Sequence, residues 1–152
     1  AEYHEKASCL TLGAPIPVDP SLGKVLVVTG GTSDIKVAME AELSLRLHGV
    51  KTDLLFDIGV AGLHRLLGCL DLLHKAKVVI VCAGMEGSLP TVIAGLIPQP
   101  VIGLPVSIGY GVSNEGKVAL QSMLASCSPG LLVVNIDNGY GAAMAALRIL
   151  SS

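Results

Sequence analysis

Aromatic residues are scarce in this chain of 152 residues, which has no tryptophan, one phenylalanine and three tyrosines. Proteins that hold single-stranded nucleic acids rely on aromatic side chains on which bases stack, so such a surface is not expected here. The formal net charge of −2 also gives little attraction to phosphate backbones or to anionic membranes. We therefore expect neither a nucleic acid nor a membrane as a partner.

Charge is scarce as well, above all in the second half of the chain. The stretch from 87 to 114 contains no Asp, Glu, Lys or Arg. It is long enough for a membrane-spanning helix, but its prolines argue against one; they are Pro90, Pro98, Pro100 and Pro105. We interpret it as the buried backbone of a compact α/β fold. Because the C-terminal half is so apolar, we also expect part of its surface to be buried between subunits, which predicts a homo-oligomer.

Paired cysteines and clustered histidines are also missing. The four cysteines form no C-x-x-C pair and no secretory signal precedes them, so a reducing cytosol is the default location. The histidines lack metal-ligand spacing, so we predict no metal site. The cysteines are Cys9, Cys69, Cys82 and Cys127, and the histidines are His4, His48, His64 and His74.

Five short apolar runs recur, each continuous as for strands buried on both faces of a parallel sheet. The runs span 24–30, 51–57, 77–84, 100–105 and 130–137. Between and after these runs, apolar residues recur with the spacing of a helix at 34–48, 61–74, about 90–97, 115–126 and 139–150. This alternation predicts a three-layer α/β/α sandwich with a five-stranded parallel sheet, flavodoxin-like or Rossmann-like, over residues 23–152. Residues 1–22, with three prolines, are expected to form an N-terminal arm or linker.

Polar residues follow the carboxyl ends of the predicted strands, where ligands bind in such sheets. The segment TGGTSD follows the first strand, and its glycines, Thr32, Ser33 and helix N–H groups suit a phosphate. Ser33 or Asp34 could equally be a simple helix N-cap. The segment is neither a Walker A loop nor a complete G-x-G-x-x-G fingerprint. The other polar residues expected at this edge are Asp57, His64, Arg65, Glu86 and Asp137.

Three of the candidate residues have an ordinary alternative. Arg65 could clamp a phosphate or carboxylate, or could belong with His64 to a surface pair. Glu86 could be a general base if its surroundings desolvate it, or a solvated loop acid. Cys127 follows a helix C-terminus, where the helix dipole disfavours thiolate, so a buried inert thiol is the ordinary expectation. Because Cys127 precedes the fifth strand, it lies away from its own chain's site loops, and any chemistry it does would be in a neighbouring subunit.

Several motifs resemble those of PurE-type N5-carboxyaminoimidazole ribonucleotide mutases in the same order: GGTSDIKVAMEA, GLHR, AGMEGSLPTVIAGL, PVIGLPVS and NGYGAAMAALRIL. The resemblance is closer still to the PurE-like catalytic domain of the LarB family, through TSDI, DIGVAGLHRLL, VIVCAGMEGSLPTVIAGL, SIGYG and VVNIDNGYGAA. Together these motifs cover residues 25–150, and EYHEKA resembles the join that follows a separate N-terminal domain in full-length members. One departure separates the families: where PurE enzymes carry a proton-transferring histidine, this chain has Ser88.

The LarB resemblance implies a pyridinium-3,5-biscarboxylic acid mononucleotide synthase, which acts in nickel-pincer cofactor synthesis. Such an enzyme carboxylates nicotinic acid adenine dinucleotide with CO2 at ring atom C5, hydrolyses the phosphoanhydride and releases AMP. The resemblance implies Cys127 as the nucleophile and Glu86 as the base. It also implies a set of residues that bind the nucleotide: Gly31, Thr32, Ser33, Asp34, Asp57, Gly59, His64, Arg65, Ala83, Gly84, Met85, Tyr110, Asp137, Asn138 and Gly139.

The same resemblance implies no tightly bound cofactor and an octamer, with NAD and AMP as ligands that imitate the substrate. Whether Mg2+ assists the phosphoanhydride step stays open. Two alternatives also stay open: a PurE-type aminoimidazole ribonucleotide carboxylase or mutase, and a non-catalytic nucleotide-binding protein with a buried Cys127 and a solvated Glu86.

Overall fold

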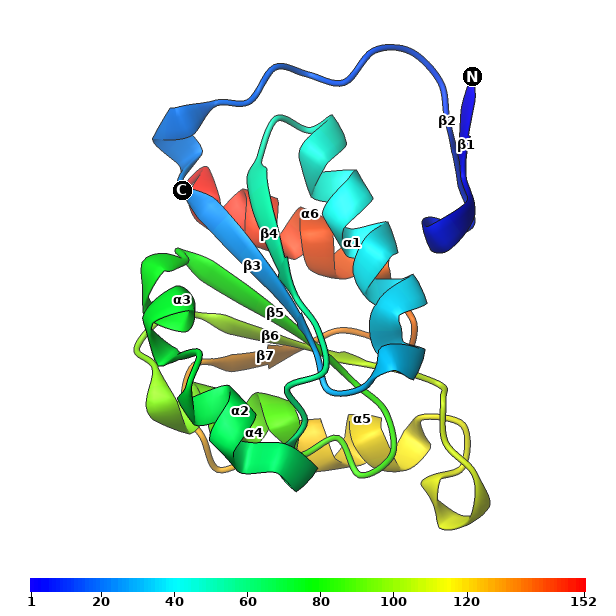
Figure 1. Ribbon diagram of the computed structural model, residues 1–152, viewed down its shortest axis with the longest axis vertical. Helices are drawn as coiled ribbons and strands as arrows, with labels where there is room; N and C mark the ends of the chain where they lie inside the picture. Colours follow the sequence, from blue (N-terminus) through cyan, green and yellow to red (C-terminus); the bar gives the residue numbers. More distant parts are fainter.

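The computed structural model covers residues 1–152 and contains one parallel sheet of five strands, with helices on both of its faces (Figure 1). The sheet has the order β4-β3-β5-β6-β7, and every neighbouring pair in it is parallel. Its strands are β3 (Lys24–Thr29), β4 (Lys51–Leu55), β5 (Val78–Ala83), β6 (Val101–Pro105) and β7 (Leu131–Val133). This arrangement confirms the predicted fold class.

The order of the strands creates a switch point between β3 and β5. From β3 the chain moves outward to β4, then returns past β3 to β5 and continues through β6 to β7. The connections after β3 and β5 therefore lead to opposite sides of the sheet and leave a crevice between them, as in flavodoxin-like sheets. Both strands are apolar and buried along nearly their whole length, with Val27 paired to Ile80 at the centre.

Helices α1 (Ile35–Leu47) and α6 (Gly139–Leu150) cover one face of the sheet. The other face carries α2 (Leu63–Leu67), α3 (Leu70–Lys75), α4 (Leu89–Leu96) and α5 (Lys117–Leu124). Each face buries 16 residues in its own apolar cluster, so the strands need apolar side chains in both directions. That requirement explains why the strands are continuous apolar runs in the sequence.

Two predicted elements differ in the structure. The helix expected at 61–74 is divided into α2 and α3 at Gly68 and Cys69, where glycine is a poor helix former. The strand expected at 130–137 ends at Val133. Beyond it, the side chain of Asn135 accepts a hydrogen bond from the N–H of Ile136 at 2.8 Å, which offers the backbone an alternative to the sheet.

The N-terminal segment contains a hairpin that the sequence did not indicate. Strands β1 (Glu2–His4) and β2 (Cys9–Thr11) pair antiparallel around a 3-10 turn, whose Ala7 is buried against α1. The following residues are tied to the turn between α1 and β4, where Asp19 N–H donates to the Gly49 carbonyl at 2.8 Å. No helix in the structure combines the length and the apolar character needed to cross a membrane.

Candidate active site

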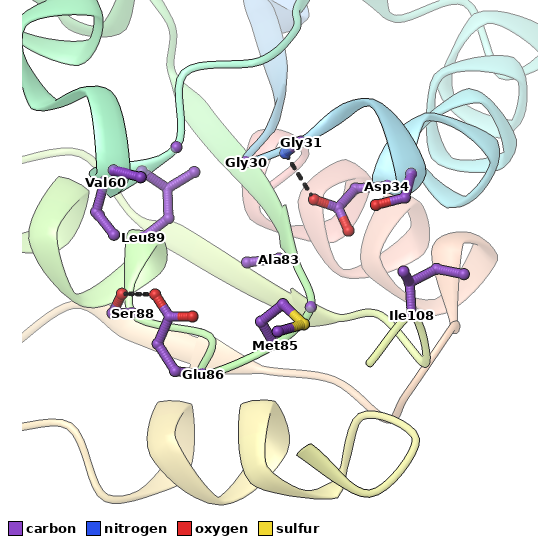
Figure 2. Close-up of a pocket in the computed structure, with 14 residues that line it drawn as sticks. Gly30, Gly31, Asp34, Val60, Ala83, Met85, Glu86, Ser88, Leu89 and Ile108 are labelled. Atoms are coloured by element: carbon purple, nitrogen blue, oxygen red, sulfur yellow. Dashed lines mark hydrogen bonds between the residues drawn. The ribbon is translucent and has the colours of Figure 1, made fainter. Parts of the chain in front are cut away.

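A cavity of about 240 Å³ opens at the carboxyl ends of β3 and β5, at the switch point of the sheet (Figure 2). Eight of the residues proposed from the sequence line it: Gly31, Ser33, Asp34, Gly59, Ala83, Gly84, Met85 and Glu86. Six further lining residues were not singled out as binding residues: Gly30, Val60, Ala61, Ser88, Leu89 and Ile108. Most of these six have no reactive group, and only their position beside predicted residues could have indicated them.

Asp34 is the buried acid of the cavity, with 4% of its surface exposed. Its Oδ2 accepts a hydrogen bond from the N–H of Gly31 at 2.9 Å. Burial raises the pKa of this carboxyl, and hydrogen bonds from the backbone of Gly31, Gly84 and Gly30 offset only part of the effect. The N-cap interpretation is not confirmed, because α1 has no side-chain cap hydrogen bond. The Asp34 carboxyl instead holds the N–H at the start of the preceding 3-10 turn (Thr32–Asp34) and lines the cavity.

Glu86 is the second acid of the cavity (Figure 2), and it is exposed in the single chain, as expected for a solvated loop acid rather than for a desolvated base. Ser88 Oγ donates a hydrogen bond to Glu86 Oε1 at 2.9 Å. No histidine lines the cavity. The side chains lining the cavity that could accept a proton near neutral pH are therefore the carboxyl groups of Asp34 and Glu86.

The backbone that carries Glu86 has an uncommon conformation. Met85 has a φ of +52°, which costs a non-glycine residue free energy, and Gly87 has a φ of +62°. A Cβ on Gly87 would lie 2.7 Å from the Cα of Ala119, so α5 packs directly against this loop. Strained backbone of this kind is concentrated at ligand sites, and here it places the Glu86 side chain at the cavity mouth.

Glycine also allows the loops that follow β3 and β4 to meet. A Cβ on Gly59 would lie 2.6 Å from the carbonyl oxygen of Gly30, so only glycine fits there. The same loop is fastened where the N–H of Asp57 donates to Thr29 Oγ1 at 3.1 Å. Close contact between the loops forms one wall of the cavity.

The remaining predicted residues of this edge lie outside the cavity lining. Arg65 Nη1 forms an ion pair with Asp57 Oδ2 at 2.8 Å, and both side chains are exposed. The pair is in the connection after β4, which also supplies Gly59 to the cavity. Three other predicted residues are exposed and do not line it: Thr32, His64 and Tyr110.

The residues that follow β7 have structural contacts. Asp137 Oδ1 accepts a hydrogen bond from the N–H of Ser107 at 2.9 Å, which joins the loops after β6 and β7. Asn138 caps α6 by accepting from the N–H of Gly141 at 2.8 Å. A Cβ on Gly139 would lie 2.8 Å from the carbonyl of Val37, so this glycine lets α6 approach α1. None of the three lines the cavity.

Cys127 lies in the connection between α5 and β7 and is exposed, so the expectation of a buried thiol is wrong for the single chain. This connection leads into the amino end of β7, whereas the cavity lies at the carboxyl ends of the strands. The structure therefore does not bring Cys127 and Glu86 together within one chain. No group of three or more His, Cys, Asp or Glu side chains is arranged to hold a metal ion.

The fold is thus a flavodoxin-like α/β sheet with a cavity at its switch point, where such folds bind ligands, and the cavity is lined by glycine-rich loops and two carboxyl groups. Residues 24–152 match the sequence profile of the AIR carboxylase family, and the chain belongs to that family. It is thus a PurE-like member of a family of carboxylases and mutases.

Two proteins of Methanocaldococcus jannaschii illustrate the relationship. An uncharacterised protein is 50% identical over 127 residues, which cover 82% of this chain and 48% of that protein. The N5-carboxyaminoimidazole ribonucleotide mutase is 36% identical over 132 residues, which cover 84% of this chain and 78% of the mutase. This chain therefore spans about half the length of the first relative.

The fold is also that of two solved structures from Treponema denticola. The structure of a PurE2 variant superposes with a TM-score of 0.71 at 22% identity, covering 84% of this chain and 79% of that one. The PurE structure superposes with a TM-score of 0.69 at 23% identity, covering 84% of this chain and 80% of that one. At such identities the likeness concerns the fold.

Proposed function

We propose that this chain carboxylates the pyridinium ring of nicotinic acid adenine dinucleotide at C5, using CO2, and hydrolyses the phosphoanhydride to release AMP. The product would be pyridinium-3,5-biscarboxylic acid mononucleotide. The observation that carries the proposal is the pairing of Glu86 with Ser88 at 2.9 Å in a cavity that no histidine lines. An imidazole-carboxylating relative would need its histidine at the place of Ser88.

The reaction explains why a nucleophile and a base are both required. A pyridinium ring is electron-poor and does not attack CO2. Addition of the Cys127 thiolate at C4 forms a C–S bond and moves an electron pair onto the ring nitrogen, which makes C5 nucleophilic. C5 then forms a bond to CO2, Glu86 takes the C5 proton, and loss of the thiolate from C4 restores the aromatic ring. Water finally cleaves the phosphoanhydride.

A second copy of the chain would supply the thiol. Cys127 is exposed and lies outside its own chain's cavity. The cavity of about 240 Å³ is also smaller than the roughly 300–1,000 Å³ of typical ligand sites, so a dinucleotide needs further walls. An assembly such as an octamer would provide both the walls and the thiol. In it, Ser33, Asp34 and Arg65 would hold ribose and phosphate.

Complementation between subunits tests this arrangement. Cys127→Ser and Glu86→Gln should each abolish carboxylation and leave the fold intact, as checked by circular dichroism. Mixed oligomers of the two variants should regain activity, because some sites then receive one intact Cys127 and one intact Glu86. Normal turnover by either variant alone would refute the mechanism, and failure of the mixture would refute the shared site.

The second candidate is a PurE-type mutase that acts on N5-carboxyaminoimidazole ribonucleotide. It is favoured by the relative of that name, which is 36% identical over 84% of this chain. The two carboxyl groups in the cavity, Asp34 and Glu86, would then have to replace the missing imidazole. Turnover of the imidazole substrate by the wild type, measured by mass spectrometry, would favour this candidate.

A further inference from the structure

The loop that carries Cys127 is fastened to α4 through one threonine. Thr91 Oγ1 donates a hydrogen bond to Ser126 Oγ at 2.8 Å, and Ser128 Oγ donates to the Thr91 carbonyl at 2.9 Å. The N–H of Ser128 also donates to Ser126 Oγ at 3.2 Å. Thus both neighbours of Cys127 are bonded to the same residue.

Cys127 itself makes no hydrogen bond through its backbone or its thiol, and its side chain is exposed. Its place is therefore set by Ser126 and Ser128. Both hydrogen bonds to Thr91 are partly buried, so they persist better than a bond at the open surface would. The Cys127 thiol is thus held from both sides through its neighbours and is free at its tip.

The helix that holds this loop also begins at the cavity. Ser88, which donates to Glu86, directly precedes α4, and its carbonyl accepts from the N–H of Val92 at 3.2 Å. Thr91 is in the same first turn of α4. One short helix therefore supports the Glu86 loop at its start and the Cys127 loop at its side.

We infer that Thr91 is a positioning residue for Cys127, which it holds in the geometry that attack on a neighbour's ligand requires. This inference rests on the proposed function. Loss of one hydrogen bond of this kind shifts the balance between a held and a free loop by about 2- to 10-fold. The reaction should slow by a similar factor, because only the held loop places the thiol productively.

The test compares Thr91→Val with Thr91→Ser in the protein produced from its full-length gene. Valine has nearly the shape of threonine but no hydroxyl, whereas serine keeps the hydroxyl. We expect Thr91→Val to lower kcat for carboxylation of nicotinic acid adenine dinucleotide by about 2- to 10-fold with an unchanged KM, and Thr91→Ser to stay within about twofold of wild type.

Two further variants separate positioning from general stability. Thr52→Val is the matched control, because Thr52 Oγ1 also donates a partly buried hydrogen bond, at 3.2 Å to the Val50 carbonyl, on β4. It should leave kcat unchanged. Ser126→Ala removes this acceptor and leaves α4 intact, but it also removes the bond from the Ser128 N–H. It should therefore lower kcat at least as much as Thr91→Val, and the double variant should be no slower than Ser126→Ala alone.

The outcomes distinguish this inference from the proposed function. If Cys127→Ser is inactive but Thr91→Val and Ser126→Ala turn over at the wild-type rate, the thiol acts and Thr91 does not position it. If Thr91→Ser is as slow as Thr91→Val, the hydroxyl is not the cause and the inference fails. If Cys127→Ser turns over normally, the proposed mechanism fails and the inference fails with it.

Discussion

Replacing Gly84 by alanine should damage the cavity at the point where the loop after β5 crosses the loop after β6. A Cβ on Gly84 would lie 2.4 Å from the carbonyl oxygen of Ile108, and real Cβ atoms essentially never approach closer than 3.0 Å. The two backbones must therefore separate by at least about 0.6 Å. The neighbouring contact, in which the N–H of Met85 donates to the same carbonyl at 3.3 Å, would be lost or stretched.

The size of the effect follows from this displacement. Forcing backbone apart in a packed region costs about 1–3 kcal/mol of unfolding free energy. Glu86 is two residues further along the chain and would move with this backbone. A misplacement of about 1 Å can lower a rate about 100-fold, so we expect a shift of about half that size to lower activity about 10-fold. Gly68→Ala is the matched control, because its Cβ would lie an ordinary 3.4 Å from the nearest atom and its φ is −69°.

Urea denaturation measures the unfolding free energy, and carboxylation turnover measures the activity. Gly84→Ala should lower both the unfolding free energy and the turnover. Gly68→Ala should keep full turnover and raise the unfolding free energy by about 0.4–1 kcal/mol, because alanine adopts this helical conformation with a smaller loss of chain entropy than glycine. If Gly84→Ala is as stable and as active as Gly68→Ala, the close crossing of the loops does not shape the site.

Three other changes have defined outcomes. Burial raises the pKa of Asp34, so its contribution to stability is complete below its ordinary pKa and is lost as the pH rises through the raised value. The variant Asp34→Asn cannot ionise at this position. Between about pH 4 and pH 7, its unfolding free energy in urea should therefore fall less than that of the wild type. Arg65→Ala removes an exposed ion pair with Asp57, so thermal unfolding should report a change of only about 0–1 kcal/mol, whereas calorimetric titration with AMP should show weaker binding if Arg65 holds phosphate. Gly139→Ala should cost about 1–3 kcal/mol in urea denaturation, because its Cβ would lie 2.8 Å from the carbonyl of Val37 on the facing helix.

The parallel sheet could be predicted because its central strands β3, β5 and β6 are buried on both faces, and such strands are visible as apolar runs in the sequence. Where burial is weaker, the prediction was less accurate. Strand β7 is a short edge strand whose Leu132 is half exposed, and the bond from Ile136 to the Asn135 side chain ends it early. The hairpin at the start of the chain has strands of three residues, too short for a pattern.

Ligands bind at the carboxyl ends of the strands in such sheets, and this rule indicated the part of the site that one chain contains, since Asp34 and Glu86 both line the cavity. Contacts between residues far apart in the sequence could not be predicted in this way. Thr91 and Ser126 are 35 residues apart, and no local pattern predicts their hydrogen bond. Neither the sequence nor one chain places Cys127 beside a ligand, because that depends on how copies of the chain assemble.

The reaction with carbon-13 labelled bicarbonate tests the central claim most directly. The protein is incubated with the label and with either nicotinic acid adenine dinucleotide or aminoimidazole ribonucleotide, and the products are separated by mass spectrometry. We predict one labelled carboxyl group on the pyridinium ring, with AMP released in equal amount, and no labelled imidazole product. A labelled imidazole carboxylate, with the dinucleotide unchanged, would contradict the account.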